Sequence, residues 1–379
     1  MTGARPAAGA GFEPPIYPYE RLASARQKAD AWPGGIVDLS IGTPTDPPPQ
    51  GALDALAAAD RSGGVRGYPT SVGSPALRRA AADWMEARLG VTVALDDLAV
   101  CVGTKEFVAT LAQWLKLRTP RRDTVLYPAI AYPTYEMSAV LAGCRAVAVP
   151  VDDRFRLRLD AVDDGDADRA LALWVNTPGN PAGQLDDLDA AAAWGRRRGV
   201  PVFSDECYAE FTWDGPPRTI LSSGSEGVVA VHSLSKRSNL AGLRLGWYAG
   251  DPDLVHYLSE VRKHVGMMVP GPVQLAGAAA LADQDHVERQ RTRYRRRLER
   301  MQEILAGLGV DAPLPAGGFY LWAEAPEGDA WGFAARLAAE GGVLVSPGDI
   351  YGAAGVGRVR IAMVQSDERL ELVAARLGV

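Results

Sequence analysis

Short apolar runs that alternate with helical patterns are the feature of this sequence that most constrains its fold. Several of the runs are apolar on both faces, as strands are when they lie between two layers of helices. The strand candidates cover residues 98–103, 124–128, 145–151, 171–176, 200–205, 227–233 and 243–250. Strands and helices in alternation predict an α/β fold with a mostly parallel sheet.

A different pattern begins at residue 285. Apolar residues of the stretch 285–308 recur at intervals of seven, four, three and four, which predicts one long amphipathic helix. Such a helix suits a connector, and the sequence after it alternates strands and helices again. The length of 379 residues is typical of about two or three domains, so we expect a large domain followed by a small α/β domain.

Charge and composition exclude several classes of protein. The net charge of −6 argues against nucleic acid or an anionic membrane as the main partner. Seven arginines between residues 289 and 300 could bind RNA, but they alternate with a clean apolar stripe, and we interpret them as a solvated helix face. Three widely spaced cysteines and four histidines form no CxxC, HxH or HExxH pattern, so we expect reduced thiols and no metal.

The opening stretch and the apolar runs bear on location. Residues 1–15 are rich in Ala, Gly and Pro and lack the apolar core of a signal peptide, so we expect a flexible tail. No apolar run approaches the roughly 20 residues that span a bilayer. We therefore expect a cytoplasmic protein.

Polar residues repeatedly follow the ends of the predicted strands. The segments "VGTKE", "NTPGNPAG", "SDECY" and "HSLSK" each come directly after a strand candidate. In open α/β sheets, ligands collect outside the carboxyl ends of the strands. We therefore expect one shared site, formed by Thr104, Asn180, Asp205, Tyr208, Ser233, Ser235 and Lys236.

A carboxylate and a lysine define the reactive end of this site. Asp205 ends an apolar strand, where a carboxylate is costly unless it meets a cation, such as Lys236 or a protonated pyridine nitrogen. Taken singly, Lys236 could be a surface residue, Asp205 a helix cap and Asn180 a turn residue. Their order favours a common role, because Asn180 precedes Asp205 by 25 residues and Asp205 precedes Lys236 by 31.

A phosphate site is predicted at the other end. Thr104 and Lys105 begin a helix after Gly103, and free N–H groups at the start of a helix attract phosphate. Ser233 and Arg244 add a hydroxyl and a forked donor. A phosphate at one end, a partner for a ring nitrogen at the other and a reactive lysine between them describe a site for pyridoxal phosphate (PLP).

The order of these motifs resembles that of the class I/II aminotransferases of PLP fold type I. "NTPGNPAG" resembles the family's NPxG turn, "SDECYAEF" its D-x-x-Y segment, "SLSKRSNLAGLRLG" its S-x-S-K-x₇-R segment, "GYPTSVGSPALRRA" its Y-x₄-G stretch and "GRVRIAMV" its C-terminal R-I segment. The likeness runs from about residue 35 to the end. It implies a large PLP-binding domain with a mostly parallel seven-stranded sheet, and a small α/β domain.

The resemblance also implies how the chain is divided. After the tail 1–15, residues 16–50 would form a segment that joins the small domain, and residues 51–284 would form the large domain. Residues 285–379 would form the small C-terminal domain, beginning with the long connecting helix. Tyr68 would reach the phosphate of a partner subunit, so the active unit would be a homodimer with shared active sites.

Roles for single residues follow from their match to family motifs. Lys236 would form a Schiff base with the cofactor and then act as general acid and base. Asp205 would keep the pyridine nitrogen protonated, Asn180 and Tyr208 would hydrogen-bond the ring hydroxyl, and Tyr132 would stack on the ring. The phosphate end of the cofactor would be bound by Gly103, Thr104, Lys105, Ser233, Ser235 and Arg244.

The substrate would lie beside the cofactor. Arg360 would bind the α-carboxylate of the substrate as a bidentate pair, and Gly42 would let the backbone approach the substrate closely. The stretches "DLSIGTPTDP", "VRKHVGMMVPGPVQ" and "GFYLWA" are similar to actinobacterial N-succinyldiaminopimelate aminotransferases. This likeness implies exchange of an amino group between glutamate and N-succinyl-L,L-diaminopimelate. The candidates for binding a distal carboxylate are Lys105, Arg21, Lys263 and His264.

Two other functions are weighed against this one. An enzyme of secondary metabolism could use the same cofactor and the same loss of the α-proton for β- or γ-elimination, replacement or carbon–carbon bond formation. A non-catalytic regulator with this fold is disfavoured, because only about 35 residues precede the likeness and they show no helix-turn-helix pattern.

Overall fold

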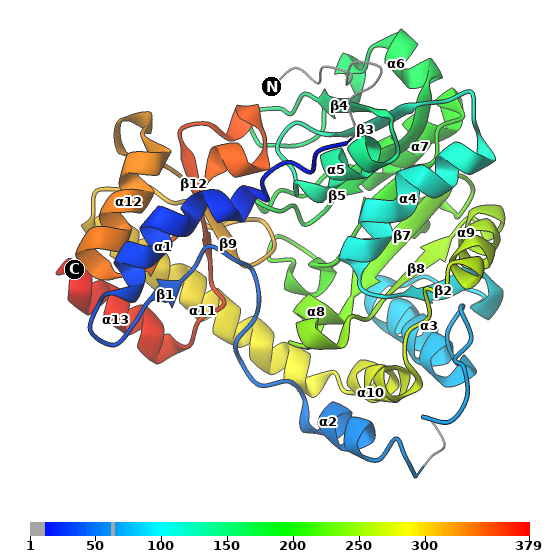
Figure 1. Cartoon of the computed structure of the whole chain (residues 1–379), viewed down its shortest axis with the longest axis horizontal. Helices are drawn as coiled ribbons and strands as arrows, with labels where there is room; N and C mark the ends of the chain where they lie inside the picture. The colour runs from blue at the N-terminus through cyan, green and yellow to red at the C-terminus, as the bar shows by residue number, and fades with distance from the viewer. Residues whose placement is uncertain (1–11, 62–64) are drawn as a thin grey trace.

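A seven-stranded sheet forms the centre of the larger part of the molecule, on the right of Figure 1. The computed structural model describes residues 12–61 and 65–379, so most of the predicted tail 1–15 lies outside the described residues. All seven predicted runs are strands of this one sheet, and the prediction of an α/β fold is confirmed. The strands are β2 (Leu98–Cys101), β3 (Thr124–Pro128), β4 (Arg145–Val149), β5 (Ala170–Asn176), β6 (Val202–Asp205), β7 (Val228–Ser233) and β8 (Gly246–Gly250).

One strand of this sheet runs against the others. The order is β2-β8-β7-β6-β5-β3-β4, and neighbours are parallel except where β8 pairs with β2 and with β7. Because β2 and β7 are both antiparallel to β8, they are parallel to each other. The segment that precedes β8 therefore lies at the same edge of the sheet as the segments that follow the other strands.

Helices cover both faces of the sheet, which explains why its strands are apolar on both sides. One face packs against α4 (Thr104–Arg118), α5 (Thr134–Leu141) and α9 (Pro252–His264). The opposite face packs against α3 (Pro75–Leu89), α7 (Leu188–Arg198) and α10 (Gly271–Ala282). The shorter helices of this part are α2 (Gln50–Ala57), α6 (Asp164–Asp168) and α8 (Leu234–Arg237).

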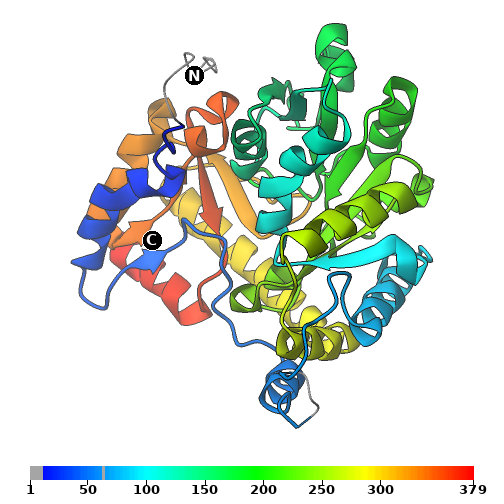
Figure 2. The same cartoon turned by 45° about the vertical axis from the view of Figure 1, so that its right-hand side comes forward.

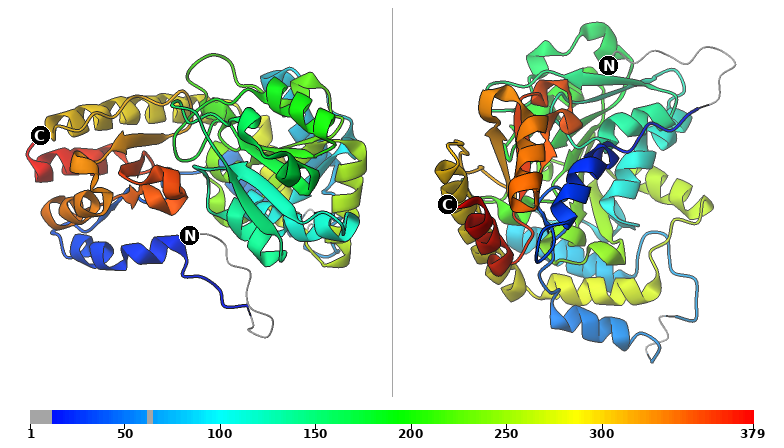
Figure 3. Two further views of the ribbon diagram at one scale, coloured as in Figure 1. Left: turned by 90° about the horizontal axis from the view of Figure 1, so that it is seen from above. Right: turned by 60° about the vertical axis from the view of Figure 1, so that its left-hand side comes forward.

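The smaller part contains the N-terminal segment α1–β1 beside the C-terminal segment, as Figures 2 and 3 show from other directions. A three-stranded antiparallel sheet has the order β11-β12-β9, and β1 pairs in parallel with β10. The N-terminal segment thus packs on the C-terminal one, and the domain boundaries at residues 50 and 284 stay predictions. The elements are α1 (Ala23–Asp30), β1 (Val37–Asp38), α11 (Asp285–Gly307), β9 (Tyr320–Glu324), α12 (Ala330–Gly341), β10 (Val343–Leu344), β11 (Ser346–Pro347), β12 (Arg358–Ala362) and α13 (Asp367–Leu377).

The long helix expected from residue 285 onward is α11, and five of its seven arginines form ion pairs with acids. Arg300 on the surface forms an ion pair with Glu371 at 2.8 Å. Arg297 is buried instead, and it donates to Asp46 at 2.6 and 2.8 Å and to Asp367 at 2.7 Å. The interpretation of a solvated face is therefore wrong for Arg297, which ties the loop after β1 to α11 and α13.

Two negative findings hold for the ranges 12–61 and 65–379. None of the helices described there is long and apolar enough to cross a membrane. Within the same ranges, no group of three or more His, Cys, Asp or Glu side chains is placed to hold a metal ion.

Candidate active site

The residues singled out at strand ends meet at one edge of the seven-stranded sheet. β2, β5, β6 and β7 run in the same direction, so the loops after them open at this edge. Arg244 arrives from the opposite direction, because it precedes the inverted strand β8. Side chains from loops far apart in sequence are then in contact: Cys207 Sγ lies 3.5 Å from Thr104 Oγ1, after β6 and β2 respectively.

Lys236 lies in α8, directly after β7, and is partly buried. Its Nζ donates a hydrogen bond to the main-chain oxygen of Gly42. Burial of the ammonium is the main cause that lowers the pKa of Lys236 to about 8, and the positive charges of Arg360 and Arg244 act in the same direction. At pH 7 about one tenth of such amines are neutral, against fewer than about one in a thousand for an ordinary lysine. Burial thus makes the neutral, nucleophilic form of this lysine far more accessible than that of an ordinary lysine.

Asp205 is the buried acid of the site. One carboxylate oxygen accepts from the Tyr135 hydroxyl at 2.8 Å, and the other accepts from the Cys207 N–H at 3.2 Å. Burial raises the pKa of Asp205, although the hydrogen bonds from Cys207 and Tyr135 counteract this rise in part. A buried carboxylate in this state gains stability from a cation placed against it. A protonated ring nitrogen is a cation of suitable size.

Groups of positive charge meet at the start of α4. Gly103 is the N-cap of this helix with φ +77°, and a Cβ there would lie 2.3 Å from Arg244 Nη2. Glycine therefore lets the guanidinium approach the free N–H groups of the first helical turn. The Ser233 hydroxyl adds a polar group at the start of α8, where it accepts from the N–H of Ser235 at 3.1 Å. The group is suited to a phosphate.

Arg360 forms the opposite wall of the site and is almost fully buried. Its Nη1 donates to Asn180 Oδ1 at 2.8 Å, and its Nη2 donates to the main-chain oxygen of Ser40. The rings of Tyr320 and Tyr351 lie 4.3 and 4.7 Å from its guanidinium carbon. Among the described residues it has no acidic partner within ion-pair distance, so it is a buried cation that can take an anion.

Tyr132, Tyr208 and Tyr68 occupy three different surroundings. Tyr132 is partly buried and meets the ring of Tyr135 edge-on, with centroids 6.0 Å apart. Tyr208 is buried, and its hydroxyl lies 2.8 Å from that of Tyr320. Tyr68 is 99% exposed, so it contributes nothing to the site of its own chain. Its expected role is instead toward the phosphate of a partner subunit.

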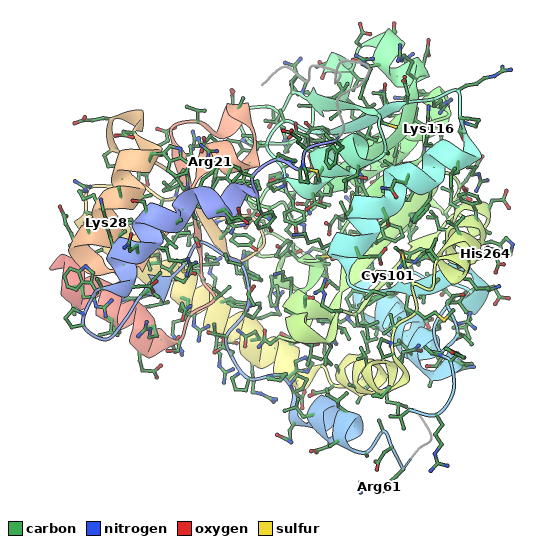
Figure 4. All side chains as sticks on the ribbon, in the orientation of Figure 1. Arg21, Lys28, Arg61, Cys101, Lys116 and His264 are labelled. Carbon is green, nitrogen blue, oxygen red and sulfur yellow. The ribbon has the colours of Figure 1, made fainter. Side chains whose placement is uncertain are left out.

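The four candidates for a distal carboxylate do not lie together. Lys105, two residues after Gly103, is exposed, and its Nζ donates to the Tyr17 hydroxyl at 3.0 Å. Arg21 forms an ion pair with Asp349 at 2.8 Å. Figure 4 shows Arg21 and His264 on opposite sides of the molecule. His264 is the last residue of α9 and Lys263 precedes it. This end of α9 lies near the start of α4, because Arg262 pairs with Glu106, but Lys263 itself is already neutralised by Glu260 at 2.6 Å.

Sequence reasoning missed three side chains that touch the site residues. Tyr135 bonds Asp205, and its place three residues after Tyr132 at the start of a helix was a usable signal. Tyr320 and Tyr351 enclose Arg360, but an aromatic residue in an apolar segment gives no sign that it faces a ligand. These contacts depend on strand pairing in the smaller part.

Comparison with known proteins assigns the chain to a family. Residues 35–377 match the model of the family "Aminotransferase class I and II", and the chain belongs to this family. Members of the family use PLP, so the protein is a PLP-dependent aminotransferase. Its α/β architecture is that of fold type I: it superposes on an aspartate aminotransferase of Thermus thermophilus with a TM-score of 0.84 and 26% identity, over 96% of both chains.

Relatives similar to this chain have names that specify different substrates. A 4-dedimethylamino-4-oxo-anhydrotetracycline transaminase of Streptomyces rimosus is 44% identical over 96% of this chain and 99% of its own. An LL-diaminopimelate aminotransferase of Dehalococcoides mccartyi is 32% identical over 95% of this chain and 94% of its own. A solved structure of a probable N-succinyldiaminopimelate aminotransferase from Thermus thermophilus is 33% identical, with a TM-score of 0.85 over 95% of this chain and 99% of its own.

The donor set of the site fits PLP. The buried acid Asp205 suits the ring nitrogen, and Arg244 with the start of α4 suits the phosphate. Lys236 lies between them, with an amine that deprotonates near neutral pH. When bound, PLP supplies an electron-accepting ring that makes the α-proton of an amino acid acidic enough to be removed.

Proposed function

We propose that Lys236 is the catalytic residue of this aminotransferase and that its Nζ takes and returns the α-proton of the amino acid. The observation that carries the proposal is a buried amine with a pKa of about 8, held beside Asp205 and Arg360. Asp205 holds the protonated ring nitrogen, and Tyr135 fixes the orientation of the Asp205 carboxylate. The hydrogen bond from Lys236 to Gly42 directs the amine into the site before the cofactor binds.

The remaining binding roles follow from the free donors of the site. Arg244, Thr104, Ser233 and the N–H groups at the start of α4 bind the phosphate, with Gly103, Lys105 and Ser235 shaping that end. Asn180 and Tyr208 donate to the ring hydroxyl, and Tyr132 covers one face of the ring. Asn180 is suited to this task because its oxygen is occupied by Arg360, which leaves its NH₂ group to donate.

The substrate is an amino acid with an acidic side chain. Arg360 binds the α-carboxylate, because it is a buried guanidinium without an acidic partner among the described residues. Gly42 lets the substrate approach closely. The exposed cation Lys105 binds the distal carboxylate, since its contact with Tyr17 is to a neutral group that a carboxylate can displace. Arg21 is less suited, because Asp349 already neutralises it.

Glutamate with 2-oxoglutarate is the proposed donor pair, and N-succinyl-L,L-diaminopimelate is the leading acidic substrate. The names of the diaminopimelate-related relatives support this choice. A second candidate comes from the relative that acts on an oxo group of anhydrotetracycline, which favours an enzyme recruited to secondary metabolism. β- or γ-elimination, replacement or carbon–carbon bond formation are further alternatives, because each begins with the same loss of the α-proton.

We also propose that the active unit is a homodimer in the cytoplasm. Tyr68 supports the dimer, because a tyrosine ring that is 99% exposed is available to a second copy of the chain. The net charge of −6 supports small molecules rather than nucleic acid or a membrane surface as partners.

The function is tested with a half-reaction. The PLP-loaded enzyme is mixed with excess glutamate without an acceptor, and its visible absorption spectrum is recorded. We expect the spectrum to change completely and to return when N-succinyl-2-amino-6-ketopimelate is added, because one amino group is stored on the enzyme between the two halves. A spectrum that glutamate leaves unchanged would contradict transamination from glutamate. A change that only another ketone reverses would favour the second candidate.

The role of Lys105 is tested with Lys105→Ala. The variant is expected to raise the KM for the acidic keto acid by about 10- to 150-fold, because a charge-assisted contact is worth about 1.5–3 kcal/mol. The KM for alanine as amino donor should rise less, because alanine has no distal carboxylate. The control is Lys263→Ala, which removes an exposed lysine outside the site. Equal changes in both variants would contradict the assignment.

A further inference from the structure

Two tyrosine hydroxyls meet in the middle of the site. Tyr208 Oη and Tyr320 Oη lie 2.8 Å apart, and either can be the donor. Tyr208 belongs to the loop after β6, whereas Tyr320 is the first residue of β9. Both residues are buried, with 6% and 1% of their surfaces exposed. A buried hydrogen bond therefore joins the part with the seven-stranded sheet to the smaller part of the molecule.

The hydroxyl of Tyr320 also lies against Gly42. A Cβ at position 42 would be 2.0 Å from Tyr320 Oη, so only glycine leaves room for the hydroxyl there. The main-chain oxygen of Gly42 is the acceptor of the Lys236 ammonium. Tyr320 thus borders the backbone segment that holds the lysine.

The ring of Tyr320 lies under the guanidinium of Arg360, 4.3 Å from its central carbon. Strand pairing explains this contact, because Tyr320 on β9 faces Ala362 on β12, and Arg360 faces Trp322. Diagonal neighbours of this kind in an antiparallel pair lie on the same face of the sheet. A ring face is an attractive support for a guanidinium withdrawn from water.

We propose that Tyr320 is a positioning residue that links Tyr208 at the cofactor to Arg360 at the substrate carboxylate. The inference rests on the roles proposed above for Tyr208 and Arg360. Tyr320 donates its proton to the Tyr208 oxygen, and this leaves the proton of Tyr208 free for the ring hydroxyl of the cofactor. Hydrogen bonds in such a chain strengthen one another. Both groups keep their protons at neutral pH, since burial raises the pKa of Tyr320 to about 12 and that of Tyr208 well above its usual value.

The test is the pH titration of the absorption band of bound PLP, without substrate, in Tyr320→Phe. Donors to the ring hydroxyl stabilise its deprotonated form and so lower the pH at which the band changes. We expect this midpoint to rise by about half to one pH unit when the support of Tyr208 is lost. The KM for glutamate should change less than about threefold, because the phenylalanine ring stays under Arg360. Tyr320→Leu, which removes that ring, should raise the KM by about three- to tenfold.

Tyr351→Phe is the matched control, because it also removes a hydroxyl from a ring on Arg360 but has no contact with Tyr208. Its own hydroxyl bonds that of Tyr19 at 3.1 Å. The midpoint should not move in this control, and Tyr208→Phe should move it more than Tyr320→Phe does. Adding Tyr320→Phe to Tyr208→Phe should then have no further effect. A shift with Tyr208→Phe but none with Tyr320→Phe, or equal shifts with Tyr320→Phe and Tyr351→Phe, would overturn the inference alone. No shift with Tyr208→Phe would overturn the role of Tyr208 and the inference with it.

Discussion

Lys236→Ala is expected to abolish transamination, with a fall in turnover of at least about four orders of magnitude. The amine is the group that takes and returns the α-proton, and no other described lysine lies beside Asp205 and Arg360. The variant should still fold, because α8 is short and is fixed by the Ser233 hydroxyl that caps it. The measurement is turnover from glutamate, together with the visible band of bound PLP, which should be lost or displaced.

Two controls make this prediction specific. Borohydride reduction of the loaded wild-type enzyme should fix the cofactor to the peptide that contains residue 236, as mass spectrometry can show. Lys263→Ala, which removes an exposed lysine paired with Glu260, should retain the band and the turnover. Turnover that survives Lys236→Ala, or a label on another lysine, would contradict the central assignment.

The large sheet could be predicted from the sequence because its strands are buried on both faces. The run 171–176 is apolar up to its last residue, Asn176, and it matches the observed strand β5 to within one residue. The direction of β8 could not be predicted, because a hydrophobic pattern is the same when read either way. The inversion nevertheless left the predicted site intact, since it brings Arg244 to the same edge as the other loops.

The reactive residues at the strand ends could also be predicted, whereas the residues that position them could not. Lys236 and Asp205 are conspicuous, because a charged group at the end of an apolar strand needs a partner. Tyr320 is not conspicuous in the sequence. Its proposed positioning role depends on the pairing of β9 with β12 and on the hydrogen bond with Tyr208 in the other part of the molecule. Lys263 and Lys105 are equally basic in the sequence, and only their places in the fold separate them.

Arg360→Ala is expected to raise the KM for glutamate by about 10²- to 10³-fold while PLP stays bound. Removing one partner of a buried, hydrogen-bonded charge pair costs about 2–5 kcal/mol. The phosphate end should be unaffected, because Arg244 lies against Gly103 at the start of α4, whereas Arg360 bonds Asn180 and Ser40. The measurement is the KM of the half-reaction, with cofactor occupancy followed by absorbance.

Arg358→Ala is a matched control on the same strand, because the guanidinium of Arg358 pairs with Glu324 outside the site. It should leave the KM nearly unchanged. Loss of PLP from Arg360→Ala would show that this arginine holds the cofactor rather than the substrate. A donor amine that lacks the α-carboxylate should react equally well with both variants.

The same arginine separates the two proposed acceptors. A keto acid derived from N-succinyl-L,L-diaminopimelate carries an α-carboxylate, so Arg360→Ala should weaken its binding as much as that of glutamate. An oxo group on a ring system has no such carboxylate, so its KM should change little while that of glutamate rises. For each acceptor in turn, the change in its KM in Arg360→Ala is compared with the change in the KM for glutamate. The comparison shows whether the acceptor carries a carboxylate that the buried guanidinium binds. An equal response of both acceptors would contradict the assignment of Arg360 to the α-carboxylate.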